Sequence, residues 1–278
     1  MNFSKSIKVS GRLLSFDRPR VMGVMNVTKD SFYAKSRVVN EGDILNRAGE
    51  MLKEGADILD VGGYSSRPGA MKVPIKDEIG VTSHAIELIK SHFPHALISI
   101  DTFRSEVAEA AMRAGAKIVN DISGGTLDPK MVDFITANQV PYIAMHMRGN
   151  PKNMQKMTKY KHIISEILFY FSKLIERLKD KGHTDLIIDP GFGFAKTTEQ
   201  NFEILSNLEL FKNLESIILV GLSRKSMIYK TLKTDASEAL NGTTVLNTLA
   251  LTKGADILRV HDVRPAVEAI KLTRKALT

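Results

Sequence analysis

The sequence contains no cysteine and no tryptophan among its 278 residues. Without cysteine, disulfide bonds and thiolate metal sites are excluded, and a reducing, cytoplasmic compartment is the expected location. No stretch of about 18 apolar residues occurs, so we expect no membrane-spanning helix. The first residues also lack the continuous apolar core of a secretory signal, which argues against export.

The sequence has an excess of positive charge, but the basic residues are spread along the chain. The formal net charge is +8, and 43% of the residues are hydrophobic. Lysine and arginine alternate with glutamate and aspartate, as in KLIERLKDK, and no basic stripe is interleaved with aromatic residues. This pattern is typical of a solvated surface and argues against nucleic-acid binding. It also gives a mild positive field that attracts small anionic substrates, so we expect a small-molecule substrate.

No G-x-G-x-x-G sequence follows the first apolar run, which disfavours a doubly wound sheet, the main alternative fold. What recurs instead is a unit made of a helix end, Gly-Ala, a short apolar run and polar residues. It occurs as EGADILDVGG, RAGAKIVNDISGG and KGADILRVHDV. We predict that the first glycines of these units, Gly55, Gly115 and Gly254, end helices in the left-handed conformation.

Eight short apolar runs alternate with amphipathic stretches. The runs, which we predict to be parallel strands buried on both faces, are Val21–Met25, Ile58–Val61, Leu97–Ile100, Lys117–Val119, Tyr142–Met145, Leu186–Ile188, Ile217–Val220 and Ile257–Val260. Helical spacing extends over Asp43–Lys53, Lys76–Ser91, Ser105–Arg113, Pro129–Ala137, Ile163–Lys179, Glu199–Leu210, Glu238–Thr252 and Ala266–Ala276. This alternation predicts an α/β fold, a single (β/α)8 TIM barrel. We expect residues 1–20 to form an N-terminal hairpin or cap, over Ile7–Phe16, and residues 21–278 to form the barrel, as one domain overall.

Polar side chains follow the predicted strands, at the end of the barrel where active sites lie. Taken alone, some have an ordinary structural explanation: Asp101 as a helix-start residue, Asn120 as a turn residue and His261 as a hydrogen-bonded core residue. Arg259 lies two residues before His261, so a strand directs both to one face, and a buried arginine needs an anion or a carboxylate partner. Together the polar residues exceed what a structural barrel needs; they are Asn26, Asp101, Asn120, Asp189, Lys225, Arg259 and His261.

Seven segments in a fixed order give the sequence a specific resemblance. They are MNVTKDSF, GGYSSRPGA, IDTFRSEVAEAAMRAGAKIVNDISGG, MHMRGNPKNMQ, IIDPGFGFAKTTEQN, VGLSRKSM and ADILRVHDV. This series, from Val21 to Val263, resembles the motifs of the dihydropteroate synthase family of folate biosynthesis. The resemblance implies a transferase that joins 6-hydroxymethyl-7,8-dihydropterin diphosphate to 4-aminobenzoate and releases diphosphate. It also implies Mg²⁺ as cofactor and a homodimer formed through the later helices.

The same resemblance implies roles for individual residues. The expected pterin contacts are Asp101, Asn120, Met145, Asp189 and Lys225, with the Asp189 carboxylate accepting hydrogen bonds from the amino-pyrimidinone edge. The expected diphosphate contacts are Asn26, Ser66, Arg67, Arg259 and His261, and Asn26 is also the expected Mg²⁺ ligand. The expected aminobenzoate contacts, where a sulfonamide competes, are Pro68, Phe194, Lys225 and Ser226. Lys225, Arg259 and His261 are expected to be catalytic, through electrostatic stabilisation of a dissociative step.

The sequence departs from the family pattern in two loops. Lys29 stands where the family usually has proline, Tyr33–Ser36 replaces a Ser-Asp-Gly-Gly segment, and Tyr64 and Ser66 replace Glu and Thr. Two other functions fit the same barrel: a pterin-binding methyltransferase domain that serves a cobalamin partner, and a catalytically silent pterin-binding scaffold. The GLSRKS segment with Arg259 and His261 favours the synthase over the methyltransferase, which has no diphosphate to bind. The intact polar set favours it over the scaffold.

The segment DPGFGFAKT, residues 189–197, has the glycines, lysine and threonine of a phosphate-binding loop. Its carboxylate repels a phosphate but suits the N–H edge of a pterin, so we interpret it as part of a pterin site. Gly191 and Gly193 are expected to let the chain turn tightly beneath the ligand. Lys196 and Thr197 are expected to begin the next helix, with Thr197 as its cap.

Overall fold

Eight parallel strands close into a barrel in the computed structural model, which describes residues 5–27, 41–64 and 73–277. The strands are β3 (Arg20–Asn26), β4 (Ile58–Gly62), β5 (Ile98–Asp101), β6 (Ile118–Asp121), β7 (Tyr142–Met145), β8 (Leu186–Asp189), β9 (Ile217–Val220) and β10 (Ile257–Val260). They follow one another around the barrel in chain order, and β10 pairs with β3 to close it. The TIM barrel is confirmed, and all carboxyl strand ends meet at one mouth.

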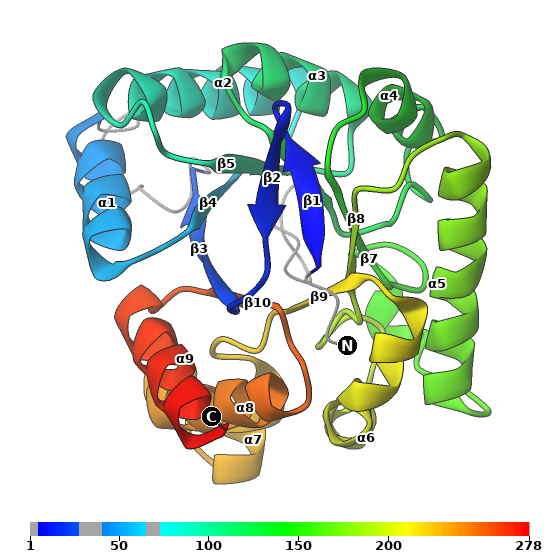
Figure 1. Ribbon diagram of the computed structural model, residues 1–278. Coiled ribbons are helices and arrows are strands. Elements are labelled where there is room, and N and C mark those ends of the chain that lie inside the picture. Colours follow the sequence, from blue (N-terminus) through cyan, green and yellow to red (C-terminus); the bar gives the residue numbers. More distant parts are fainter. Residues whose placement is uncertain (1–4, 28–40, 65–72, 278) are drawn as a thin grey trace.

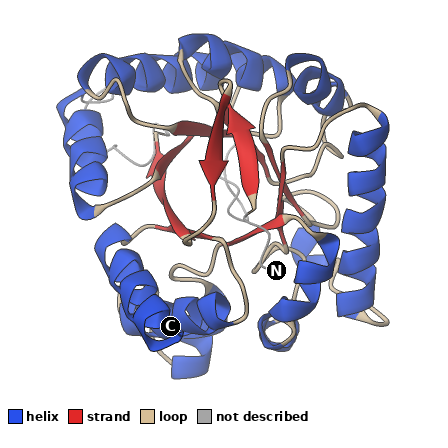
Figure 2. Cartoon of the chain, viewed as in Figure 1, coloured by secondary structure: helices blue, strands red, loops and turns tan. Residues whose placement is uncertain are grey.

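Helices form a layer around the strands (Figure 2). They are α1 (Glu41–Glu54), α2 (Ile75–His92), α3 (Ser105–Ala114), α4 (Lys130–Asn138), α5 (Ile163–Asp180), α6 (Thr198–Ser206), α7 (Ser226–Leu232), α8 (Leu240–Thr252) and α9 (Val263–Leu277), with short 3₁₀ segments η2 (Met154–Lys156) and η3 (Leu208–Leu214). The predicted helix Glu199–Leu210 is therefore α6 followed by η3, and α7 was not among the stretches with helical spacing. Gly55, Gly115 and Gly254 follow helices with φ of 105°, 122° and 99°, as predicted.

The N-terminal hairpin covers the amino end of the barrel. It consists of β1 (Ser6–Val9) and β2 (Arg12–Ser15), which pair antiparallel and lie across the opening in Figure 1. Ile7 and Phe16 pack into an apolar layer formed by the lower parts of the strands; the layer includes Met22, Ile58, Ile118, Ile143, Ile187, Ile217, Leu219 and Ile257. The predicted N-terminal hairpin is confirmed, and it seals the interior of the barrel at this end.

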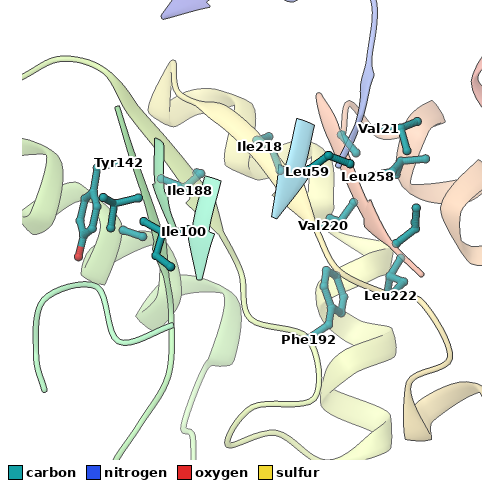
Figure 3. Packing of buried hydrophobic residues seen from close by; sticks show 14 of the residues in the cluster. Val21, Leu59, Ile100, Tyr142, Ile188, Phe192, Ile218, Val220, Leu222 and Leu258 are labelled. Atoms are coloured by element: carbon teal, nitrogen blue, oxygen red, sulfur yellow. The ribbon is translucent and has the colours of Figure 1, made fainter. Parts of the chain in front are cut away.

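A second apolar layer lies between the strands and the helices, and Figure 3 shows part of it, including Leu59, Ile188, Ile218 and Leu258. Each of these residues is adjacent in sequence to an isoleucine of the inner layer. The strands are thus buried on both faces, which explains their nearly continuous apolar sequences. In the part of the chain that the structure describes, no helix has the length and apolar character needed to cross a membrane.

Candidate active site

The upper part of the barrel interior is polar, whereas the lower part is apolar. Side chains two residues apart on a strand share a face. On four strands the inner layer contributes an isoleucine, and the residue two positions later is polar; the pairs are Ile58 and Asp60, Ile118 and Asn120, Ile187 and Asp189, and Ile257 and Arg259. The period of the strands therefore brings two carboxylates, an amide and a guanidinium together at the carboxyl mouth.

A partly buried ion-pair network joins four of the strands. Arg259 Nε donates to Asp60 Oδ2 over 2.6 Å, and Arg259 Nη2 donates to Asp101 Oδ2 over 2.5 Å. Asn120 Nδ2 donates to the same oxygen of Asp60 over 2.9 Å. Arg259 thus has its counter-charges within the protein, which is the carboxylate alternative that the sequence left open.

The charged groups of this network change one another's pKa values. Burial and the neighbouring Asp60 carboxylate raise the pKa of Asp101 to about 7 against the opposing effect of Arg259. Burial opposes the charge of Arg259, but Asp60 and Asp101 raise its pKa, so the guanidinium stays charged. Asp101 is therefore a carboxyl group of the mouth that changes its charge near neutral pH.

Asp189 ends β8 and begins the loop that carries much of the site. It is only 7% exposed, and its Oδ1 accepts a hydrogen bond of 2.8 Å from the backbone N–H of Gly191. Within the residues that the structure describes, no hydrogen bond from the protein reaches its Oδ2. Burial raises the pKa of Asp189, while the Gly191 N–H and the charge of Lys225 oppose the rise. One carboxylate oxygen is left for a ligand with N–H donors.

Lys225 lies across the loop that follows β8. Its Nζ donates to the carbonyl of Phe192 over 2.6 Å and lies 4.4 Å from the centre of the Phe194 ring. Its stem passes over Gly193, whose φ of +82° gives the tight turn predicted from the sequence. Burial lowers the pKa of Lys225 to about 8, although the carboxylate of Asp189 opposes this. The lysine, the aromatic ring and the loop thus form one wall of the mouth.

His261 follows β10 and is held by two other parts of the chain. Its backbone N–H donates to Ser223 Oγ over 3.2 Å, and its ring Nδ1 lies 3.0 Å from the same oxygen. Arg47 of α1 donates to the carbonyl of His261 over 2.6 Å. The segment after β9 and helix α1 therefore set the position of this histidine jointly.

The remaining predicted residues are only partly within the described structure. Met145 ends β7 in a small apolar cluster at the mouth, against which Phe194 packs. Asn26 is the exposed last residue of β3, and Ser226 is the first residue of α7. Ser66, Arg67 and Pro68, and the unusual segment Lys29–Ser36, lie outside the described residues.

Asp60 and Ser223 were not predicted to belong to the site, and one prediction about Lys196 is wrong. Asp60 stands within the apolar run ILDVG, and a carboxylate inside a doubly buried strand was the sign that could have revealed it. Apart from its place in the segment GLSRKS, nothing in the sequence indicated that Ser223 belongs to the site. Thr197 is the N-cap of α6, as predicted, with Gln200 completing a capping box. Lys196, however, precedes the cap and is only 4% exposed.

The side chains at the mouth of the barrel decide whether the expected magnesium ion has suitable protein ligands there. The described part of the chain holds no cluster of three or more histidine, aspartate or glutamate side chains suited to a metal. Mg²⁺ often binds through one or two protein oxygens, with substrate phosphate and water completing its shell. The single amide oxygen of Asn26 at the end of β3 fits that kind of site.

The fold and the site together define an α/β-barrel protein with a polar, partly buried ligand site at its carboxyl mouth. Residues 22–261 match the family described as pterin binding enzyme. A dihydropteroate synthase from Synechocystis sp. is 41% identical over 258 residues, which are 92% of this chain and 89% of the relative. The chain belongs to the dihydropteroate synthase family of pterin-binding enzymes.

Solved structures agree with this assignment. The Xanthomonas albilineans dihydropteroate synthase with 4-aminobenzoic acid superposes with a TM-score of 0.91 at 34% identity, over 99% of both chains. The Yersinia pestis dihydropteroate synthase in complex with a sulfonamide drug gives the same TM-score and identity, over 98% of this chain and 99% of that one. The barrel and its N-terminal hairpin are thus shared over nearly the whole length.

Proposed function

We propose that this protein is a transferase that condenses 6-hydroxymethyl-7,8-dihydropterin diphosphate with 4-aminobenzoate, giving 7,8-dihydropteroate and diphosphate for tetrahydrofolate biosynthesis. One observation carries the proposal: the buried carboxylate of Asp189, whose Oδ2 accepts no hydrogen bond from the residues that the structure describes, lies near Lys225 in a chain 41% identical to a dihydropteroate synthase. The 4-aminobenzoic acid in the Xanthomonas albilineans relative supports the choice of second substrate.

The pterin is held at the polar centre of the mouth. Asp189 Oδ2 accepts from one N–H donor of the amino-pyrimidinone edge, and Oδ1, which also accepts from the Gly191 N–H, has a second lone pair for a neighbouring donor, so the carboxylate can act as a bidentate acceptor. Asp101 and Asn120 supply further polar contacts, and Met145 supplies an apolar wall. A ligand without this N–H edge leaves the buried carboxylate unpaired, so the site discriminates strongly in favour of pterins.

The diphosphate is held beside β3 and β10. His261, Arg259 and Asn26 contact it, together with Ser66 and Arg67 of the second loop. Because Arg259 is already paired with two carboxylates, part of its field at the diphosphate is cancelled. Asn26 would hold Mg²⁺, and the bound ion would supply positive charge beside the leaving diphosphate.

The reaction exchanges one bond at the pterin methylene carbon. The bond from this carbon to a diphosphate oxygen breaks, the bond to the amine nitrogen of 4-aminobenzoate forms, and the amine proton passes to solvent. The step is dissociative, and the neutral arylamine needs no strong general base. Lys225, Phe194, Ser226 and Pro68 position the aminobenzoate, so the protein contributes positioning and electrostatic stabilisation.

The proposal is tested by measuring diphosphate release and dihydropteroate formation from the purified protein. We expect both products in equal amounts when the pterin diphosphate, 4-aminobenzoate and Mg²⁺ are all present. Removing Mg²⁺ with a chelator should suppress turnover, and adding it back should restore it. Absence of dihydropteroate with all three present contradicts the proposal.

The proposed assembly is a homodimer formed through the later helices, and the proposed compartment is the cytoplasm. Apolar side chains are exposed on these helices; they are Leu232, Leu240, Val245, Leu249, Leu272 and Leu277. Figure 1 shows α7, α8 and α9 gathered at one side of the barrel. Sedimentation of the wild type against a Val245→Asp variant tests the dimer, since a buried charge should dissociate it.

A further inference from the structure

We propose that Lys196 is a positioning residue of the active site: its ammonium group ties the loop after β8 to the end of β7 and so sets the wall on which Lys225 rests. The inference deepens the proposed function and rests on it. Lys196 belongs to the segment DPGFGFAKT but has no part in the chemistry described above. Its surroundings show why it is buried there.

The Lys196 ammonium group is surrounded by acceptors from two segments of the chain. Its Nζ donates to the carbonyl of Gly191 over 3.0 Å and to that of Phe194 over 2.9 Å, both in the loop after β8. It also lies 3.2 Å from the carbonyl of His146 and 3.1 Å from the ring Nδ1 of His146, which follows β7. The lysine therefore cross-links the ends of two neighbouring strands.

The backbone explains why a cation is needed at this point. Gly191 has a φ of +73°, and a Cβ at this position would collide with the carbonyl oxygen of His146. Several carbonyl dipoles thus converge in a site that is nearly closed to water. Their negative ends repel one another unless a donor lies between them, and a charged donor is the strongest available.

The loop held by Lys196 carries the partners of Lys225. The N–H of Phe194 donates to the carbonyl of Gly191 over 3.1 Å, so the two loop carbonyls that Lys196 binds are at the ends of one tight turn. Between them lies Phe192, whose carbonyl accepts from Lys225. Phe194 itself provides the ring beneath the Lys225 ammonium group. A shift of this turn moves both partners of Lys225 together.

The charge state of Lys196 is finely balanced. Burial lowers its pKa to about 7, and burial together with the Lys196 charge lowers the pKa of His146 to about 2, so the imidazole is neutral. The other charged groups that act on Lys196 are Asp189, which favours its charge, and Lys225 and Arg148, which oppose it. The cross-link is therefore strongest below neutral pH and weaker above it.

The test is steady-state kinetics of the Lys196→Met and Lys196→Gln variants across the neutral pH range, with thermal unfolding measured alongside. We expect the Met variant to lose about 10- to 100-fold in kcat/KM, because a misplacement of about 1 Å can cost on the order of 100-fold. Gln keeps two N–H donors and should retain intermediate activity. Lys196→Met leaves the converging carbonyls without a donor, so this variant should unfold at a lower temperature than the wild type, and Lys196→Gln should lose less because it keeps two donors. Both variants should still be folded at the assay temperature. Lys181→Met changes an exposed lysine that pairs with Asp133, and it is the matched control.

The pH dependence of the kinetics separates positioning from a merely structural role. Asp101 also changes its charge near pH 7, so the readout is the ratio of variant to wild-type kcat/KM. This ratio should rise as the pH increases through about 7, because only the wild type loses the charged Lys196 cross-link there. The inference is overturned if the variants have the same kinetic constants and the same pH profile as the wild type. It is also overturned if neither variant folds. Absence of turnover in the wild type overturns the proposed function instead.

Discussion

The two ends of the barrel interior contrast more sharply than any other two regions of the molecule. At the amino end, isoleucines from six strands pack beneath the N-terminal hairpin. On four of these six strands the residue two positions further along is polar, namely Asp60, Asn120, Asp189 or Arg259, and Lys225 follows a fifth strand, β9. Buried apolar surface stabilises the fold, whereas buried charges cost folding free energy unless they are well paired. The comparison indicates that the apolar layer at the amino end stabilises the fold, while the polar residues at the carboxyl mouth serve binding and chemistry.

The largest effect on activity should come from removing a charge at the mouth. In Lys225→Ala we expect kcat/KM to fall about 1,000-fold, because an electrostatic contact of the transition state typically contributes this much. The unfolding temperature should not fall, since the burial cost of the ammonium group disappears as well.

The matched control for this variant lies at the other end of the barrel. Lys5 pairs with Asp256 over 2.9 Å below the apolar layer, and Lys5→Ala should leave kcat/KM unchanged. Equal kinetic losses in the two variants would break the contrast between the two ends.

The largest effect on stability should come from the apolar layer. Ile187 is fully buried, and Ile187→Ala should lower the free energy of unfolding by about 3 kcal/mol through lost burial and a residual cavity. Denaturant unfolding measures this change. The kcat/KM of the folded variant should stay within about threefold of the wild type; a loss comparable to that of Lys225→Ala would mean that the two layers are not separate.

Much of this organisation could be read from the sequence. Each predicted strand lies within one or two residues of the observed one, because strands buried on both faces have compact apolar runs. The polar residues at the strand ends were also recognised. Asp60 was not, because its partner Arg259 is 199 positions away and only barrel closure brings them together. Lys196 resembles a helix-start lysine in sequence, and only the crowding of carbonyls around it shows its burial.

The pH dependence of activity sharpens the contrast further. Burial lowers the pKa of Lys225 to about 8, so the lysine is charged below this pH and neutral above it. If the charge is needed, kcat/KM should fall about tenfold per pH unit at more alkaline pH. Arginine stays charged throughout, so this fall should be absent in Lys225→Arg, even if its overall rate is lower. An unchanged alkaline fall in that variant would assign the titration to another group.

A smaller effect is expected at the aminobenzoate side of the mouth. Ser226→Ala should raise the KM for 4-aminobenzoate about tenfold, the usual cost of one hydrogen bond to a charged group, without changing the KM for the pterin. A sulfonamide should compete with 4-aminobenzoate in the wild type and bind more weakly to the variant. If the sulfonamide does not compete, Ser226 and Phe194 do not line the proposed subsite.

The most direct test is calorimetric titration of 6-hydroxymethylpterin, which carries no diphosphate, into the wild type and Asp189→Asn. The substitution keeps the size of the side chain but adds N–H donors where acceptors are required. We expect the wild type to bind and the variant to bind about 100-fold more weakly, a difference of about 2.7 kcal/mol. Equal affinities, or no binding to the wild type, would contradict the assignment of the barrel mouth as a pterin site centred on Asp189.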